Sequence, residues 1–423
     1  MLEITRIREN KEAIIDGLKK RGIDALKDVE AILVADEKWR MAKTELQDVQ
    51  SESNALAKEI GNLFREGKKE EVDQVKEKTT ALKAKEQVLR QQVAEKEDQL
   101  QNLLYGLPNV PIASVPSGVS EADNEVVEEV GEKVVFKGEA FPHWELADKY
   151  KLIDFELGVK VTGAGFPFYM GKGAKLQRGL INFFLDEAEK AGYSECIPPL
   201  VVNEASGIGT GQLPDKEGQM YHVTEDDLYL IPTAEVPLTN MYRDVILPNE
   251  DFSIKISGYT PCFRREAGSY GKDVRGLNRL HQFDKVEIVR IEHPDRSMAA
   301  LDEMVNHIKG LLEKLGLHYR ILRLCGGDLG FTSAITYDFE VYSAAQERWL
   351  EVSSVSLFET FQSNRLKLRF KGADKKTQLC HTLNGSALAL PRIVAALLEN
   401  HQTTEGIIIP KALVPYVGFD RIG

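Results

Sequence analysis

Cysteine is scarce in this sequence and follows no metal-binding spacing. The 423 residues include four cysteines, Cys196, Cys262, Cys325 and Cys380, and none of them forms a C-x-x-C pair. Structural zinc sites of the common kinds use closely spaced cysteines and histidines, so the sequence predicts no zinc site. Isolated cysteines are typical of a reducing compartment, and we therefore expect a cytoplasmic protein without disulfide bonds.

Long hydrophobic runs are missing as well. No stretch approaches the roughly 20 apolar residues that a membrane-spanning helix requires. The first ten residues, MLEITRIREN, lack the apolar core of a signal peptide. The sequence therefore predicts neither a membrane partner nor secretion.

Positive charge is not in excess either. The net charge is −12, from 54 Lys and Arg against 66 Asp and Glu, which argues against a generally basic nucleic-acid coat. Local cationic tracks are compatible with this balance, because salt screens each surface charge over about 10 Å. The 43% hydrophobic and 28% charged content is typical of a globular protein, and the length indicates two or three domains.

Residues 25–105 carry a heptad pattern. Apolar residues recur at spacings of three and four over five repeats on each side of Gly67, which predicts two helices with a coiled-coil seam. The break at Glu66–Lys69 is short, so we expect an antiparallel hairpin about 60 Å long. The expected seam positions are Ile32, Ala35, Trp39, Ala42, Leu46, Val49, Leu56, Ile60 and Leu63, then Val72, Val75, Thr79, Leu82, Glu86, Leu89, Val93, Lys96, Leu100 and Leu103.

By itself such a hairpin is a spacer or an oligomerisation device as readily as a binding arm. Its cations alternate with acidic residues, so the sequence does not indicate which face would contact phosphates. The candidates for such contacts are Lys38, Arg40, Lys43, Lys58, Arg65, Lys68, Lys69, Lys76, Lys78, Lys83, Lys85 and Arg90.

A proline-containing stretch follows the heptads. Pro108, Pro111 and Pro116 interrupt helix formation and precede an acidic segment. We therefore divide the chain into a helical arm at 1–110, a linker at 111–140 and a mixed helix-and-strand domain at 141–423.

The segment YTPCFRREAGSYGKDVRGLNRLHQFDKVE, residues 259–287, carries the strongest indication of chemistry. It predicts a strand at Thr260–Glu266, a polar glycine-rich loop and a returning strand at Leu277–Glu287. Alternation would place Arg264 and Glu266 on one face of the first strand. A guanidinium binds phosphate with two hydrogen bonds and a carboxylate accepts from amines, which is typical of a nucleoside triphosphate site. For an isolated FRxE tetrapeptide, a hairpin with surface ion pairs is the better interpretation.

This segment resembles motif 2 of the class II aminoacyl-tRNA synthetases. FRxE is followed by RxxxF at Arg279 and Phe283, and the string GSYGKDVRGLNRLHQFDKVE is similar to the seryl-tRNA synthetase form of the motif. Other segments resemble the same family in the expected order. They are LLYGLPNVP at 103–111, a motif 1 segment at 163–202 ending near Pro199, GTGQLP at 209–214, LIPTAEVPL at 230–238, WLEVSS at 349–354 and the motif 3 segment HTLNGSALALPR at 381–392.

The resemblance implies both a fold and an activity. The fold would be α+β, with an N-terminal antiparallel coiled-coil hairpin followed by a class II synthetase-like antiparallel sheet flanked by helices. The activity would be that of a serine–tRNA ligase, which activates L-serine with ATP to seryl-adenylate and transfers it to the 3′ end of tRNA(Ser), and also of tRNA(Sec). The hairpin would bind the tRNA, and motif 1 would form a homodimer interface.

The resemblance also implies roles for particular residues. Arg264, Arg392 and Glu266 would be catalytic, with Arg264 on the α-phosphate, Arg392 and Arg279 on the γ-phosphate, and Glu266 facing adenine. The expected ATP-binding residues are Arg264, Arg265, Glu266, Arg279, Glu351, Val352, Ser353, Ser354 and Arg392, and Glu351 and Ser354 would ligate Mg²⁺. The expected serine-binding residues are Thr233, Ala234, Glu235, Glu287 and Ser386, of which Glu287 and Ser386 would bind the hydroxyl.

Two other interpretations belong to different functional classes. A paralogue that charges a carrier protein would lack the arm, and a non-catalytic relative would have lost Arg264, Glu266 or Arg392.

The chain departs from the family pattern at Pro391, where glycine is usual, and at Val355, Leu357, Phe358, Thr360 and Asn364. Arg392, in a mostly apolar helix, needs an anionic partner, which could be an internal carboxylate or the phosphate.

Overall fold

The computed structural model describes residues 1–136, 138–215, 218–248, 252–266 and 275–423. These residues form two compact units, each considered separately below. One unit comprises residues 2–19 and 23–108, and the other comprises Met1, 20–22 and 109–423. No helix within the described ranges is both long enough and apolar enough to cross a membrane.

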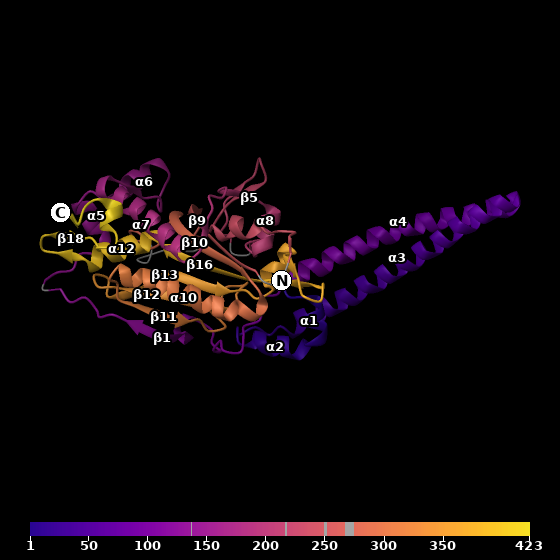
Figure 1. Ribbon diagram of the computed structural model, residues 1–423, viewed down its shortest axis with the longest axis horizontal. Helices are drawn as coiled ribbons and strands as arrows, with labels where there is room; N and C mark the ends of the chain where they lie inside the picture. The colour runs from indigo at the N-terminus through magenta and orange to yellow at the C-terminus, as the bar shows by residue number, and fades with distance from the viewer. Residues whose placement is uncertain (137, 216–217, 249–251, 267–274) are drawn as a thin grey trace. The chain divides into compact units, whose positions relative to one another are not determined.

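The first unit is dominated by two long antiparallel helices (Figure 1). It contains α1 (Ile4–Glu9), α2 (Lys11–Lys19), α3 (Leu26–Glu66) and α4 (Lys69–Gly106). Gly67 ends α3 with a left-handed φ of 76°, and its N–H donates to the carbonyls of Leu63 and Phe64. Glycine adopts this conformation without a steric penalty, which confirms the predicted sharp turn.

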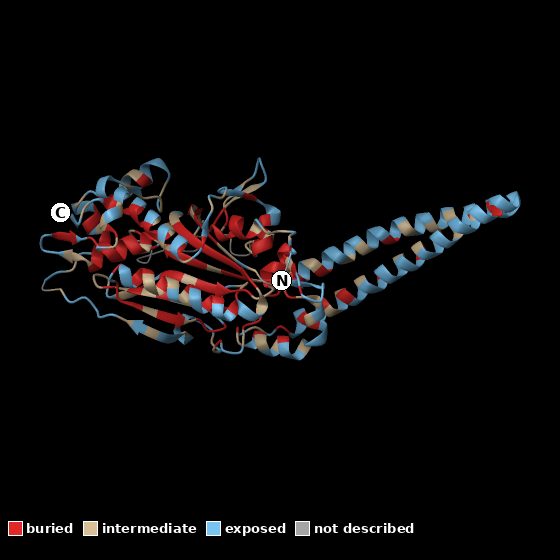
Figure 2. Ribbon diagram, viewed as in Figure 1, coloured by how far each residue is buried: buried red, intermediate tan, exposed pale blue. Residues whose placement is uncertain are grey.

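The coiled-coil seam lies close to the predicted positions. Figure 2 shows mostly exposed helices with isolated buried residues on their facing sides. Ile32, Val49 and Leu89 are buried as predicted, but at the end of α4 Leu104 is buried while Leu103 is 39% exposed. The heptad prediction for Leu103 is therefore wrong, because a helix with 3.6 residues per turn drifts by about 20° per heptad from a strict seven-residue repeat.

The second unit is built on a sheet of eight strands. Its spatial order is β1–β11–β12–β13–β16–β10–β9–β4, and Figure 1 shows most of these labels in that order. All neighbouring pairs are antiparallel except β4 and β9. The strands are β1 (Glu125–Val130), β4 (Ser194–Glu195), β9 (Ser253–Phe263), β10 (Gln282–Glu292), β11 (Tyr319–Arg323), β12 (Ile335–Ser343), β13 (Arg348–Leu357) and β16 (His381–Ala389).

Shorter elements surround this sheet. The additional strands are β2 (Ile153–Asp154), β3 (Phe168–Tyr169), β5 (Val201–Asn203), β6 (His222–Val223), β7 (Leu228–Leu230), β8 (Ile246–Leu247), β14 (Arg369–Lys371), β15 (Thr377–Leu379), β17 (Gln402–Thr403), β18 (Gly406–Ile408) and β19 (Arg421–Ile422). The helices are α5 (His143–Lys149), α6 (Phe155–Val161), α7 (Gly171–Lys190), α8 (Glu204–Thr210), α9 (Glu235–Asn240), α10 (Ser297–Lys314), α11 (Phe361–Leu366), α12 (Leu390–Asn400) and α13 (Val414–Val417), with short 3-10 turns at Glu121–Asp123 and Pro294–Arg296.

The central strands separate an apolar layer from a polar surface. On β10, Val286 and Ile288 are buried in the same apolar core as Leu180 of α7, Leu301 of α10 and Val394 of α12. Because side chains alternate along a strand, Lys285 and Glu287 face the opposite side of the sheet. The three helices therefore cover one face, and the other face is available for a site. This arrangement confirms the predicted α+β class.

The two strands of the FRxE segment begin and end differently from the prediction. The first strand stops at Phe263, and the second begins at Gln282. Arg264 and Glu266 therefore lie just beyond a strand end, where Glu266 has a left-handed φ of 49° that breaks the extended conformation. Gly268 and Gly271, expected in the intervening loop, lie outside the described residues.

The buried side chain of Arg21 stabilises the second unit, and a substitution at this position can measure by how much. Its guanidinium donates to the carbonyls of Asn109, Leu329, Gly330 and Ser333 at 2.5–3.1 Å. Burial lowers the pKa of Arg21 to about 10. Arg21→Met would leave these carbonyls unsatisfied, and we expect a loss of about 3 kcal/mol in the free energy of unfolding.

Urea unfolding followed by tryptophan fluorescence can measure this loss. In a Trp39→Phe background the signal comes from Trp144 and Trp349, both in the second unit. Arg421→Met is the matched control, because Arg421 forms a surface ion pair and its loss should cost less than about 0.5 kcal/mol. Equal effects of the two substitutions would contradict the role assigned to Arg21.

Candidate active site

A cavity of about 610 Å³ opens on the polar face of the sheet. Residues from β10, β13, β16, α9, α12 and the segments flanking β9 and β10 line it. Among the predicted site residues, the lining includes Thr233, Glu235, Arg264, Glu266, Arg279, Glu287, Glu351, Val352, Ser353, Ser354, Ser386 and Arg392. The structure therefore brings segments more than 150 residues apart in the sequence to one place.

Two predicted residues do not line this cavity. Ala234 is fully buried and packs with Leu238, Ile256 and Val289 between α9 and the sheet. Arg265 is exposed, and its main-chain N–H donates to the carbonyl of Gln219. The family motifs include both residues, but consecutive side chains along a chain point in different directions. A residue next to a cavity-lining residue therefore need not line the cavity itself.

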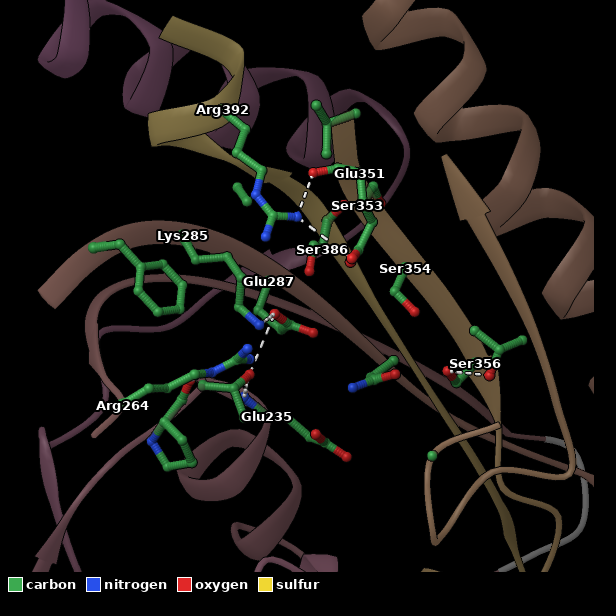
Figure 3. A pocket seen from close by; sticks show the side chains of 18 of the residues that line it. Glu235, Arg264, Lys285, Glu287, Glu351, Ser353, Ser354, Ser356, Ser386 and Arg392 are labelled. Atoms are coloured by element: carbon green, nitrogen blue, oxygen red, sulfur yellow. Dashed lines mark hydrogen bonds and ion pairs between the residues drawn. The ribbon is translucent and has the colours of Figure 1, made fainter. Parts of the chain in front are cut away.

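One end of the cavity is a buried carboxylate cluster (Figure 3). Glu287 forms an ion pair of 2.7 Å with Lys285, and both side chains are almost fully buried. The hydroxyl of Thr233 donates to Glu287 at 3.3 Å and accepts from the main-chain N–H of Glu235 at 3.2 Å. Thr233 therefore holds the start of α9 against β10, with Glu235 and Glu287 in one compartment.

Glu235 is the unusual acid of this cluster. Burial, and next the negative charge of Glu287, raise its pKa to about 7. The Gln362 amide donates to the Glu235 carboxylate at 2.6 Å, and Asn384 also bonds to it. A carboxylate with these surroundings can accept a proton or an ammonium group near neutral pH.

The other end of the cavity is cationic. Arg392 of α12 donates to the main-chain carbonyl of Glu351 at 2.6 Å and lies 3.4 Å from its carboxylate (Figure 3). Arg279 forms an ion pair of 3.0 Å with Glu266. Arg264 also lines the cavity, but Figure 3 shows it beside Glu235 rather than beside Arg392, and its guanidinium lies 5.2 Å from the centre of the Phe283 ring. Glu351 is the internal carboxylate partner of Arg392, and it is half exposed, so a phosphate group can compete for the arginine.

The strand pairing is irregular at two places beside the cavity, one on β13 and one on β16. Phe339 and Glu340 are opposite Ser353 and Glu351, so β13 has one extra residue, Val352. This bulge allows Glu351 and Ser354, three positions apart, to line the same cavity. A second irregularity, on β16, includes Leu388, which is fully buried with a φ of 90°.

Only oxygen donors are available where Mg²⁺ was predicted. Glu351 offers a carboxylate and Ser354 a hydroxyl, which suits a hard cation. Asp338 on the neighbouring strand has a pKa well above its usual range, raised by burial and then by the charge of Glu351. Within the described ranges no three His, Cys, Asp or Glu residues cluster as metal ligands. The protein donors fit an ion that takes its remaining ligands from a substrate or water.

The departures from the family pattern mostly point away from the cavity. Val355 and Leu357 are buried in the apolar core beneath the sheet. The Asn364 amide donates to the carbonyl of Met1, and Pro391 occupies the first turn of α12, where proline is tolerated. Phe358 and Pro391 are the departing residues that line the cavity, and Thr360 is the N-cap residue of α11.

Several lining residues were not predicted from the sequence. Lys285 and Asn384 lie two positions from Glu287 and Ser386, so strand alternation could have identified both. Asn278 and Phe283 also line the cavity. Gln362 does not line the cavity but donates to Glu235, and the sequence did not indicate this contact because Gln362 lies on a helix remote from Glu235 in the chain.

Comparisons with known proteins agree with this geometry. A model of the seryl-tRNA synthetase N-terminal domain matches residues 1–111, and one of the class II tRNA synthetase core domain (G, H, P, S and T) matches residues 220–401. The serine–tRNA ligase of Salinibacter ruber is 54% identical over 425 residues, covering 100% of this chain and 99% of that protein. The serine–tRNA ligase of Akkermansia muciniphila is 47% identical over 424 residues, with the same coverage.

A solved structure gives the same result. The seryl-tRNA synthetase from Pyrococcus horikoshii, determined in complex with ATP, superposes with a TM-score of 0.91 at 34% identity. The match covers 100% of this chain and 99% of that chain. The resemblance read from motif 2 and the predicted class II fold are therefore confirmed.

The raised pKa of Glu235 predicts a pH-dependent cost to stability. Because the folded state holds the proton up to a pH of about 7, whereas the ordinary pKa of a glutamate is 4.5, stability falls as pH rises between these values. Glu235→Gln removes this loss, so the ligand-free variant should be more stable than wild type by up to about 3 kcal/mol at pH 8. At pH 4 the two proteins should differ little. Urea unfolding at both pH values measures the difference, and parallel pH curves would refute the assignment.

Proposed function

This chain belongs to the seryl-tRNA synthetase family, and we propose from that membership that it activates L-serine with ATP and transfers the seryl group to the 3′ end of tRNA. One observation carries the proposal: a single cavity holds buried carboxylates at one end and arginines with replaceable partners at the other. Such a cavity suits a substrate with an ammonium group on one side and a polyphosphate on the other. The retained Arg264, Glu266 and Arg392 argue against an inactive relative, and the long arm argues against a carrier-protein ligase.

The first step joins serine to AMP. The Glu235 carboxylate would bind the serine ammonium group, and Glu287 and Ser386 would bind its hydroxyl. The serine carboxylate then attacks the α-phosphorus of ATP, forming the mixed anhydride while pyrophosphate leaves. Arg264 would bind the α-phosphate, and Arg392 with Arg279 the γ-phosphate, so that charge is stabilised where it develops. Glu266 would face the adenine.

The second step transfers the seryl group. A hydroxyl of the terminal ribose of tRNA attacks the anhydride carbonyl, and AMP leaves. No protein nucleophile is required in either step, because positioning and charge stabilisation supply the rate. When bound, Mg²⁺ at Glu351 and Ser354 would neutralise charge on the ATP phosphates.

We propose a helical arm at 1–110, a linker at 111–140 and a catalytic domain at 141–423, with the arm binding tRNA(Ser) and also tRNA(Sec).

A homodimer formed through the motif 1 segment is supported by its exposed apolar residues Phe168, Met170 and Ile197. Sedimentation equilibrium at micromolar concentration tests the dimer. Four free cysteines support a cytoplasmic location.

Adjacent arginines give a sharp test of the activation step. Arg264→Ala should reduce serine-dependent ATP–pyrophosphate exchange by about two to three orders of magnitude, because it removes a donor to the reacting phosphate. Arg265→Ala should reduce the rate by less than tenfold, since the Arg265 side chain is exposed outside the cavity. Equal losses, or an Arg264→Ala rate within a few-fold of wild type, would overturn the assignment.

Shortening the arm tests the transfer step. The Gln50 amide donates to the Glu86 carboxylate across the two helices, so residues 51–85 can be replaced there by a short glycine-containing turn. Activation should be unaffected, because the cavity residues all lie in the second unit. Charging of tRNA should fall strongly and lose much of its salt dependence, because phosphate contacts that release counterions are removed. Unchanged charging would identify the outer arm as a spacer.

A further inference from the structure

A buried polar network lies behind the cationic end of the cavity. The Nδ1 atom of His143 is 2.7 Å from Oε1 of Glu399, and the main-chain N–H of His143 donates to the same oxygen at 2.9 Å. Neither side chain has any solvent exposure. Ser343 also donates to Glu399. Burial raises the pKa of Glu399, but the hydrogen bonds from His143 and Ser343 outweigh burial and lower it overall, so the carboxylate is charged at neutral pH.

The other nitrogen of His143 binds the main chain at the edge of the cavity. The N–H of Leu277 donates to Nε2 at 2.8 Å. Nε2 therefore carries no proton, and Nδ1 donates its proton to Glu399. A Cβ atom on Gly276 would lie 2.2 Å from Nε2, and the φ of this glycine is 67°. The chain thus approaches the imidazole as closely as only glycine permits.

The network continues to an arginine of the cavity. The Gln346 amide donates to Glu399 at 2.9 Å and accepts from the Asn278 amide at 3.2 Å. The main-chain carbonyl of Asn278 in turn accepts from Nε of Arg392 at 3.2 Å. Glu399 and Arg392 lie on the same helix, α12. The segment at 277–278 is bonded directly to Arg392 near the start of that helix, and through His143 and Gln346 to Glu399 near its end.

We propose that His143 is a positioning residue for ATP, acting with Glu399 and Gln346 to fix residues 277–279. The fixed segment orients Arg392 through the Asn278 carbonyl and directs Arg279 into the cavity. Nothing in this network touches the carboxylate cluster of Glu235 and Glu287. Its loss should therefore weaken the use of ATP and leave the use of serine unchanged. This inference rests on the proposed function, because it assumes that the arginines bind the phosphates of ATP.

Two substitutions separate the roles of the two imidazole nitrogens. In His143→Asn the side-chain amide can occupy the Nδ1 position and donate to Glu399, but no acceptor remains for the Leu277 N–H. In His143→Gln the longer side chain can place its oxygen at the Nε2 position and accept that N–H. We expect KM for ATP in pyrophosphate exchange to rise about tenfold in His143→Asn, the effect of one lost buried hydrogen bond. His143→Gln should restore KM for ATP to within about threefold of wild type.

His401→Asn is the matched control. His401 follows the end of α12 and its Nε2 bonds to the carbonyl of Leu315, away from the cavity. This variant should leave KM for ATP unchanged. KM for serine should stay at the wild-type value in all three variants. Equal increases in both KM values, or the same increase in His401→Asn, would show that His143 only stabilises the fold.

Hydrogen exchange provides a readout that does not depend on activity. In the ligand-free enzyme, peptides covering residues 275–280 should exchange faster in His143→Asn than in wild type or His143→Gln. Unchanged exchange together with an unchanged KM for ATP would overturn the inference while leaving the proposed function intact. If wild type lacks serine-dependent exchange of pyrophosphate, the proposed function fails, and hydrogen exchange still decides whether His143 holds this segment.

Discussion

The buried ion pair between Lys285 and Glu287 allows this sheet to carry a charged site. Removing either charge from water costs several kcal/mol, and their mutual attraction at 2.7 Å offsets much of that cost. Because Lys285 balances Glu287, the compartment has one uncompensated carboxylate, Glu235, whose pKa is raised to about 7. The Glu235 carboxylate is therefore close to binding a proton at neutral pH. An ammonium group could take the place of that proton without adding net charge to the interior, which supports the amine-binding role proposed for Glu235.

Local irregularities convert the sheet into a binding surface. A regular strand would place Glu351 and Ser354 on opposite faces, and the bulge at Val352 places both in the cavity. On β16 the fully buried Leu388 has a φ of 90°, which bulky residues rarely adopt. Such conformations persist only where surrounding packing imposes them. Here the apolar layer formed by α7, α10 and α12 supplies that packing beneath the site.

The sequence predicted the elements better than it predicted contacts between them. Heptad spacing located the two arm helices and their turn, but the drift of a real helix made Leu104 rather than Leu103 the buried residue. Motif resemblance identified Arg264 and Glu287, which line the cavity, yet it also selected Ala234 and Arg265, which do not. Residues such as Gln362 and His143 could not be found, because their partners lie on remote segments and the pattern around each is that of an ordinary helix. Strand ends were also missed, since backbone conformation at Glu266 depends on tertiary contacts.

The described arginines of this protein differ in how many hydrogen bonds their guanidinium groups make, and this difference separates a structural arginine from one proposed to bind a ligand. Arg21 donates to four main-chain carbonyls at 2.5–3.1 Å. The Arg264 side chain, by contrast, makes one long hydrogen bond within the described ranges, of 3.4 Å to the carbonyl of Pro232. An arginine with so few partners in a cavity wall contributes little to the free energy of folding, because few hydrogen bonds offset the partial loss of water around its charge. An anion in the cavity could supply further acceptors to this guanidinium, which is the physical basis of the phosphate-binding role proposed for Arg264.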